Sequence, residues 1–341
     1  MIITRHLSRV VCLAALMAAS PLVQDSARAQ GAPMVMKLGT PTLNDGQHEF
    51  LKRFAAEVEK DSGGRIKGEV YPASQLGPIP REIEAVQLGA IQGFIAPAEF
   101  YEGVDPRFQV LTAPGLFQDM DHVDRVAKDP KFRESFYKLG ASRGLAVSSV
   151  FLSGPTAINS RAPVHHVADM KNLKLRVMAS AMQTNPISKL GASPVPISLG
   201  DVLPALQQGT IDGVMSVLPV LTAMRYYDAA KYITETNFSM TVSCFVLSKV
   251  WLAKLPPDLQ KIVTDDAMRI GDQMHPWVTA FYEQQKKTWG DSGGQVLQIP
   301  ADERASTMKE LGAVADNVVK ANASIKDIYD VVQQAAERTR K

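Results

Sequence analysis

The sequence predicts an α/β fold, because strands and helices alternate along its N-terminal third. Short apolar segments that predict strands lie at residues 34–41, 63–72 and 91–98. The segments between them, residues 48–63 and 81–88, repeat apolar residues at helical spacing. Strands joined by helices predict a parallel sheet, and ligands of such sheets bind outside the carboxyl ends of the strands.

The same alternation continues through the middle of the chain, and the chain is almost wholly helical from Pro256 onward. Further strands are predicted at residues 144–153, 156–160, 171–178, 192–198, 210–219 and 238–248. Further helices are predicted from about Asp119 and at residues 180–191, 200–209 and 258–289. Pro276 predicts a kink or break in the last helix, because proline lacks an amide hydrogen and clashes with the preceding turn.

The predicted strand at Lys171–Met178 carries the most interesting charged residue. Its alternation places two cations, Lys174 and Arg176, on one face together with Met178. Arg176 lies near the end of the strand, where a ligand would bind. From these residues alone the commoner explanation is a solvated charge on an edge strand, because most arginines are exposed.

The first 29 residues have the features of a secretory signal peptide. Arg5 and Arg9 precede a short apolar run, and Ala27 and Ala29 supply the small residues that precede a cleavage site. The apolar run is too short to span a bilayer, so an uncleaved anchor is the less favoured alternative. Cys12 lacks the small residues expected before a lipidated cysteine. We expect a soluble exported protein that is cleaved near Ala29.

The composition argues against nucleic acid and anionic membranes as partners, and against a fold held together by disulfides. The chain has 37 Lys and Arg residues and 35 Asp and Glu residues. Removal of the predicted leader leaves equal numbers of both, which argues against nucleic acid or an anionic membrane surface as a partner. Cys244 is the only cysteine after the leader, so no intramolecular disulfide can form. The fold must therefore rest on its core, for which 45% hydrophobic residues are sufficient.

Six segments resemble one protein family, in the same order as they follow one another in that family. They include SGGRIKGEVYPASQLGPIPREIEAVQLGAI, APGLFQDMDHVDRV, ADMKNLKLRV and LGASPVPISLGDVLPALQQGTIDG, followed by YYDAAKYITETNFS and VWLAKLPPDLQKIV. These segments resemble the periplasmic solute-binding proteins of TRAP (tripartite ATP-independent periplasmic) transporters, in their dicarboxylate-type (DctP-like) branch. The resemblance covers essentially the whole chain after the leader.

The resemblance implies a type II-like periplasmic binding protein with two α/β lobes, joined by crossing strands and by one long kinked helix. Residues 30–153 with about 242–281 would form lobe I, and residues 154–241 with about 282–341 would form lobe II. An organic acid would bind between the lobes, which close on it. The loaded protein, a monomer in the periplasm, would deliver the acid to membrane subunits of the transporter for uptake driven by an ion gradient.

The resemblance also assigns the carboxylate-binding arginine of the family to Arg176. A guanidinium matches a planar carboxylate with two parallel hydrogen bonds and stays charged at all relevant pH values. Where Ser216 stands, the family commonly has a ligand-binding asparagine. Thr156 stands where some members have a second arginine. Pro97 falls near a polar position that sugar-acid binders use in the first lobe.

These departures predict the kind of acid that binds. A site with one strong cation and otherwise weakly polar walls favours a monocarboxylate with an apolar body, such as an aromatic or branched oxo acid. A dicarboxylate or a sugar acid would leave buried polar groups unpaired, at a cost of about 1–3 kcal/mol for each group. Phe117, Leu199 and Phe151 are candidate walls of the site, and ordinary core residues are the alternative explanation for them.

We expect no metal, no cofactor and no catalysis. His165 and His166 are adjacent in an extended segment, so they point to opposite faces and do not form a metal site. The sequence has no nucleophile elbow, Walker loop or zinc signature. Two alternatives stay open, namely an exported chemosensory binding protein without its own transporter and an exported hydrolase. The hydrolase would need a nucleophile and a base in the cleft.

Overall fold

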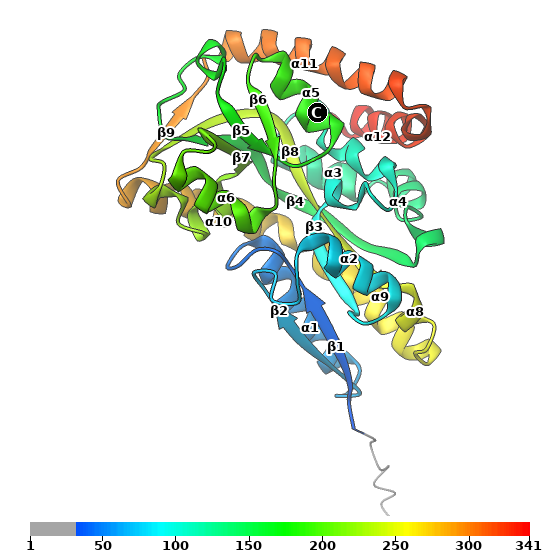
Figure 1. The fold of residues 1–341 in the computed structure, drawn as a ribbon. Coiled ribbons are helices and arrows are strands. Elements are labelled where there is room, and N and C mark those ends of the chain that lie inside the picture. The colour runs from blue at the N-terminus through cyan, green and yellow to red at the C-terminus, as the bar shows by residue number, and fades with distance from the viewer. Residues whose placement is uncertain (1–31) are drawn as a thin grey trace, which may run out of the picture. The chain divides into compact units, whose positions relative to one another are not determined.

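One continuous sheet organises the computed structural model, which describes residues 32–341 (Figure 1). Within these residues the sheet has nine strands in the order β2-β1-β3-β8-β4-β7-β5-β6, and β9 pairs with β8. The strands are β1 (Met34–Gly39), β2 (Ile66–Tyr71), β3 (Gly93–Pro97), β4 (Leu145–Ser160), β5 (Lys174–Val177), β6 (Ser193–Pro196), β7 (Gly213–Val217), β8 (Tyr232–Ser248) and β9 (Gln295–Gln298). The predicted leader lies outside the described residues.

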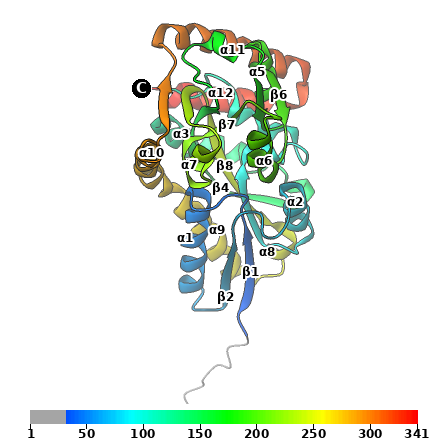
Figure 2. The same cartoon turned by 60° about the vertical axis from the view of Figure 1, so that its left-hand side comes forward.

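The sheet has two parallel parts, one on each side of the antiparallel pair of β4 and β8. Strand β1 pairs in parallel with β2 and β3, and β5 pairs in parallel with β6 and β7. Figures 1 and 2 show β1, β2, α1 and α9 at one end of this arrangement and β6, α5 and α11 at the other. The α/β fold with parallel strands, as predicted from the sequence, is confirmed.

Strands β4 and β8 are longer than the sequence pattern suggests. The sequence predicts a break between residues 144–153 and 156–160, but β4 continues through it for 16 residues. The register against β8 shifts between Leu152 and Gly154 and again between Pro155 and Ala157. Proline cannot donate to the sheet and glycine weakens a strand, so bulges absorb both residues without ending the pairing.

The helices cover this sheet and are mostly those that the sequence predicts. They are α1 (Gly46–Asp61), α2 (Ile79–Leu88), α3 (Met120–Ala127), α4 (Pro130–Phe136), α5 (Ala181–Lys189), α6 (Leu199–Gln208), α7 (Leu218–Ala223), α8 (Lys249–Leu252), α9 (Pro257–Asp272), α10 (Met274–Asp291), α11 (Ala301–Ala321) and α12 (Lys326–Thr339). Asp119 caps α3 by accepting a hydrogen bond from the backbone of His122 at 2.7 Å. Gly89 ends α2 with a left-handed φ of 81°.

The long C-terminal helix predicted over residues 258–289 is broken into α9 and α10. The break falls at Gln273, three residues before Pro276. Because Pro276 has no amide hydrogen for the carbonyl group of Asp272, α9 cannot continue past this point. The predicted break is therefore confirmed, and its position follows from the hydrogen bond that proline removes.

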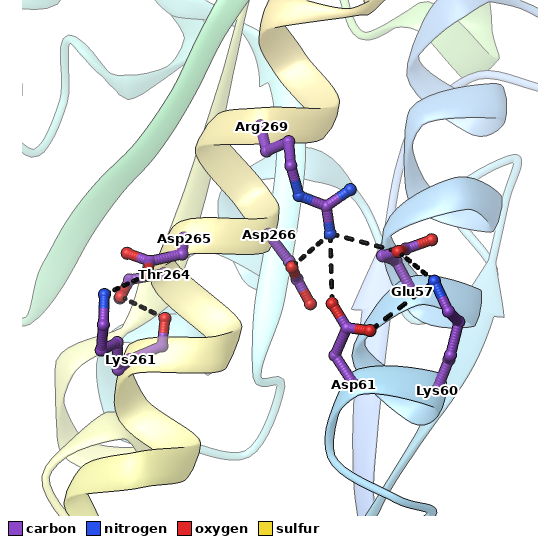
Figure 3. A network of polar contacts seen from close by, with 8 residues as sticks. All are labelled: Glu57, Lys60, Asp61, Lys261, Thr264, Asp265, Asp266 and Arg269. Carbon is purple, nitrogen blue, oxygen red and sulfur yellow. Dashed lines mark hydrogen bonds and ion pairs between the residues drawn. The ribbon is translucent and has the colours of Figure 1, made fainter.

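Helices α1 and α9 pack side by side and are joined by an ion-pair network (Figure 3). The Arg269 guanidinium of α9 lies 2.5 Å from Asp266 and 3.3 Å from both Asp61 and Glu57. The Arg269 side chain is 41% exposed, so solvent screens these pairs and each adds little to stability. The network links α9 to α1, and α1 in turn packs against β2.

The buried apolar residues form a large cluster and two smaller ones. The large cluster contains Leu38, Phe54 and Phe94 around the β1–β3 end of the sheet. Leu175 and Val214, near β5 and β7, belong to the two smaller clusters. The lobe boundaries given above stay a prediction. None of the helices within residues 32–341 is both long and apolar enough to cross a bilayer.

Candidate ligand-binding site

Arg176 is buried in the interior of the sheet. Strand β5 lies between β6 and β7, and Arg176 pairs with Val195 on one side and with Val214 on the other. The residue is only 1% exposed. The alternative of a solvated charge on an edge strand is therefore wrong. A cation in this position needs a buried anion or polar partners, because burial of an unpaired charge is costly.

The protein satisfies the Arg176 guanidinium only in part. Its Nε atom donates a hydrogen bond to the carbonyl oxygen of Ile197 at 3.1 Å. Its Nη2 atom has no hydrogen-bond partner among residues 32–341. Burial lowers the pKa of Arg176 to about 10, which leaves the group charged at neutral pH. Tethering at Nε fixes the orientation of the guanidinium and leaves Nη2 able to donate to an acceptor.

A narrow cavity opens beside Arg176 where several strands end. Its lining comes from the loop after β1, from the ends of β3, β5 and β7, and from α1, α6, α7, β4 and β8. The lining residues are Pro41, Thr42, Gln47, Pro97, Phe100, Ser153, Arg176, Met178, Leu199, Ser216, Val217, Val220 and Thr241. Arg176 is the one basic residue among them, and no acidic residue lines this cavity. The site lies at the carboxyl ends of parallel strands, as the sequence predicts.

Four of the seven residues that the sequence singles out line this cavity. Arg176 supplies the charge, and Ser216 on β7 supplies a hydroxyl group. Leu199 at the start of α6 and Pro97 at the end of β3 supply apolar surface. The structure thus brings together residues that are more than a hundred positions apart in the sequence.

The other three predicted residues lie outside the cavity lining. The Thr156 hydroxyl donates to the carbonyl oxygen of Ser239 at 3.0 Å and accepts from the amide of Ser239 at 3.2 Å. Phe151 packs against the ring of Phe50, with centroids 5.2 Å apart. Phe117 packs edge-on against the ring of His122. All three are buried, which is the placement expected of core residues.

Several cavity residues escaped the sequence analysis. Gln47 follows the capping residue Asp45 in the first turn of α1, and its Oε1 atom accepts a hydrogen bond from Thr40. Ser153 hydrogen-bonds to Ser243 on the neighbouring strand, and Thr241 also faces the cavity. One signal in the sequence could have indicated Gln47. It is a polar residue in the first turn of the helix that follows β1, and such a helix begins at the carboxyl end of a strand, where ligands bind.

A second, wider crevice of about 610 Å³ adjoins the cavity, and an acidic side chain that the sequence did not single out lines it. Phe100 and Met178 line both spaces. Glu99 lines the crevice from the short helical turn η1 (Ala98–Tyr101), directly after β3, and is only 2% exposed. It accepts a hydrogen bond from Gln183 of α5 at 2.8 Å. Burial is the largest influence on this carboxyl group and raises the pKa of Glu99 to about 8.

Comparison with known proteins identifies the family. The model of the family described as bacterial extracellular solute-binding protein, family 7 (DctP) matches residues 39–322. The chain belongs to this family. The resemblance to TRAP solute-binding proteins inferred from the sequence is thereby confirmed.

Individual members of the family match most of the chain. The protein YiiZ of Salmonella typhimurium is 31% identical over 67% of this chain and 70% of its own length. The 2,3-diketo-L-gulonate-binding periplasmic protein YiaO of Escherichia coli is 27% identical, over 85% of this chain and 88% of its own. The crystal structure of a TRAP periplasmic solute-binding protein from Desulfovibrio salexigens with bound orotic acid matches with a TM-score of 0.82 at 24% identity. That match covers 89% of this chain and 99% of the other. The likeness to this crystal structure confirms the two-lobe α/β fold.

No group of three or more His, Cys, Asp or Glu side chains suited to hold a metal ion occurs between residues 32 and 341. His166 instead pairs with Glu303 at 3.0 Å. The matching family is described as one of solute-binding proteins, and Arg176, whose Nη2 atom is unpartnered within the described chain, lines the cavity.

Proposed function

We propose that the protein is the periplasmic substrate-binding subunit of a TRAP transporter and that its ligand is a monocarboxylate with an apolar or aromatic body. One observation carries this proposal, namely a buried arginine that keeps a free donor beside a cavity with otherwise weakly polar walls. The Nη2 atom of Arg176 and the Ser216 hydroxyl are the groups that would bind the carboxylate. A planar guanidinium and a planar carboxylate match in geometry as well as in charge.

The apolar part of the lining favours a ligand with an apolar body. Pro97, Leu199 and Val220 offer no hydrogen bonds through their side chains. A second carboxylate or a row of hydroxyl groups placed against them would lose its contacts with water and gain none. Each such unpaired group costs about 1–3 kcal/mol. The orotic acid in the Desulfovibrio salexigens structure is an example of an aromatic carboxylate in a protein of this fold.

Release to the transporter follows from the same architecture. The ligand would bind between the two lobes, and contacts made only in the closed state would hold them together. The closed, loaded protein would then be recognised by the membrane subunits, where an ion gradient drives uptake. The protein would be exported to the periplasm and cleaved near Ala29. The related YiaO protein is named as a periplasmic protein, which supports this location.

A thermal-shift screen tests the proposal directly. The mature protein is refolded without ligand and melted in the presence of aromatic, branched, dicarboxylic and sugar acids. A ligand at about 100 times its dissociation constant stabilises the folded state by about 2.7 kcal/mol, so an aromatic or branched monocarboxylate should raise the melting temperature clearly. Arg176→Ala should abolish this rise. The matched control is Lys174→Ala, which removes an exposed cation from the same strand and should leave the rise unchanged.

Two results would contradict the proposal. If Arg176→Ala bound the best acid as tightly as the wild type does, Arg176 would not be the carboxylate anchor. If succinate or a polyhydroxylated sugar acid gave the largest shift, the anchor could stand, but the apolar ligand class would be wrong.

A further inference from the structure

We propose that Glu99 is a second specificity-determining residue, which acts as a neutral carboxylic acid and donates its proton to the carboxylate that Arg176 binds. Binding of a monocarboxylate would then be coupled to protonation of Glu99. This inference rests on the proposed function, because it assumes that a carboxylate binds at Arg176.

Glu99 and Arg176 approach the same place from two different strand ends. Glu99 is the second residue after β3, and Arg176 lies near the end of β5. Glu99 lines the crevice together with Met178 and Ile197. Met178 also lines the cavity beside Arg176, and Ile197 accepts the hydrogen bond from its Nε atom. The two side chains therefore line neighbouring spaces that share Phe100 and Met178 as lining residues.

Gln183 fixes the direction in which Glu99 can donate. The backbone amide of Met178 donates to Gln183 Oε1 at 3.1 Å, so the other end of the Gln183 amide must be its NH₂ group. That NH₂ group donates to Glu99 Oε1 at 2.8 Å. Because Glu99 Oε1 is thus an acceptor, the proton of the neutral acid must reside on Oε2.

Two buried polar atoms at this place lack a hydrogen-bond partner among the described residues, and both are donors when Glu99 is neutral. In the part of the chain that the structure describes, Glu99 Oε2 and Arg176 Nη2 are buried and have no hydrogen-bond partner. Within residues 32–341, the Arg176 side chain bonds to Ile197 and the Glu99 side chain bonds to Gln183, but these two unpartnered atoms do not bond to each other. A carboxylate between them offers acceptors to both donors. An ionised Glu99 would instead repel it in a space from which water is excluded.

The surrounding charges favour the neutral form of Glu99. Burial is the main cause of its raised pKa, and the nearby Glu102 carboxylate acts in the same direction. Arg176 opposes both, and so does the hydrogen bond from Gln183. Glu84 on α2 also lines the crevice, and Tyr226 lies close enough to Arg176 to favour its charged form.

The sign of the pH dependence follows from this arrangement. Below pH of about 8, Glu99 is protonated and the site accepts the carboxylate. Above this pH, binding must first return a proton to Glu99, so the association constant falls by up to about tenfold for each pH unit. The carboxylic acid of the ligand titrates far below this range and does not contribute.

Isothermal titration calorimetry with phenylpyruvate, from about pH 6 to about pH 9.5, tests the proposal. The wild type should bind with constant affinity at the acid end and lose affinity above about pH 8, with uptake of a proton in that range. Glu99→Gln is the decisive variant, because its amide keeps one acceptor for Gln183 and one donor for the ligand but cannot titrate. It should retain the affinity of the wild type at the acid end, show no loss at higher pH and take up no proton.

Glu102→Gln is the matched control, since Glu102 lines the same crevice but makes no contact in the proposed arrangement. Because the Glu102 carboxylate helps to raise the pKa of Glu99, the loss of affinity should move to a lower pH in this variant but should still occur. A wild type whose affinity does not change over this range would overturn the proposal, and so would a Glu99→Gln variant that binds weakly at every pH.

A measurement without ligand separates this inference from the proposed function. The ¹³C resonance of the Glu99 carboxyl group, assigned by its absence in Glu99→Gln, reports the protonation of the free protein. A midpoint near the ordinary value of about 4.3 would overturn the role of Glu99 even if Arg176→Ala still abolished binding of phenylpyruvate. If no acid bound to the wild type at any pH, the proposed function and this inference would both be wrong.

Discussion

The Nε atom of Arg176 donates to the backbone carbonyl oxygen of Ile197 at 3.1 Å, and this bond joins the end of β5 to the segment that leads into α6. It holds the guanidinium plane in one orientation inside the protein. One nitrogen is used to position the side chain, and Nη2 stays available. Such preorganisation lowers the entropy that ligand binding must overcome.

The first prediction concerns the energetic cost of this buried charge. Arg176→Met should abolish binding of the best carboxylate and leave the ligand-free protein equally stable or more stable, by up to about 4 kcal/mol, because an apolar side chain of similar volume needs no desolvation. Urea denaturation of the ligand-free protein measures the stability, and calorimetry measures the binding. A large loss of stability would show that the charge itself holds the fold together.

The second prediction concerns Thr156, whose hydroxyl bridges an irregular part of the β4–β8 pair. Between Pro155 and Ala157 the partner on β8 changes from Met240 to Glu235, and the Thr156 hydroxyl bonds to the backbone of Ser239 inside this bulge. Thr156→Val should cost about 1–3 kcal/mol of stability, because it leaves these buried backbone groups unpaired. It should leave the affinity for carboxylates nearly unchanged.

Thr241→Val is the matched control for this experiment. The Thr241 hydroxyl oxygen is buried and has no hydrogen-bond partner within the described chain, so its removal should not lower the stability of the ligand-free protein. If Thr156→Val instead kept full stability and lost ligand affinity, Thr156 would contact the ligand, as the family resemblance implies.

The third prediction concerns Glu235, which is buried on β8 and joins it to α10. The Glu235 carboxylate accepts from Tyr282 at 2.6 Å and from Lys286 at 2.9 Å. Burial alone would raise the pKa of Glu235, but these hydrogen bonds and the one from Gln298 together lower it. A lowered pKa means that the stabilisation is present at neutral pH and is lost as the pH falls through the pKa of the folded state.

Glu235→Gln should therefore destabilise the protein by about 1–3 kcal/mol at neutral pH and by much less at acid pH. Urea denaturation at both pH values measures the difference. An equal loss at both pH values would show that the charge of Glu235 is unimportant and that only its packing matters.

The fourth prediction concerns the close approach of α1 to β2. A Cβ atom added at Gly68 would lie 2.5 Å from the Cβ atom of Ala55 and 2.9 Å from its Cα atom. Since the helix backbone cannot move aside without cost, Gly68→Ala should destabilise the protein by about 1–3 kcal/mol. Gly103→Ala is the control, because a Cβ atom there meets nothing within 4 Å. Thermal unfolding of both variants measures the difference in stability. If the two variants were equally stable, α1 would be able to move aside at no cost.

Local signals in the sequence predict much of the fold. The spacing of apolar residues indicates the parallel α/β pattern, the Asp119 cap marks the start of α3, and Gly89 marks the end of α2. Pro276 predicts the break between α9 and α10. Each of these features depends on hydrogen bonds and side-chain directions within a few residues of chain, so a local pattern is sufficient to recognise it.

The binding site is predicted less completely. Family resemblance points to Arg176, Ser216 and Pro97, which all line the cavity. Of the three candidate walls, Leu199 lines it, whereas Phe117 and Phe151 do not. The resemblance also points to Thr156, whose hydroxyl the structure occupies with backbone bonds across a bulge that no local pattern shows. The resemblance does not point to Glu99 or Gln183. These two residues are 84 positions apart in the sequence, and only the folded chain brings them together in a buried hydrogen bond.

The sequence by itself determined the class of fold, the family and the residue that would hold an acid group. Only the tertiary structure decided that β5 lies between β6 and β7 instead of at an edge, and so turned Arg176 from a surface charge into a buried one. The physical reason is that the order of strands and the desolvation of a side chain depend on groups far away in the chain. The raised pKa of Glu99 and, within residues 32–341, the unpartnered Nη2 atom of Arg176 arise only once these distant segments have buried both side chains.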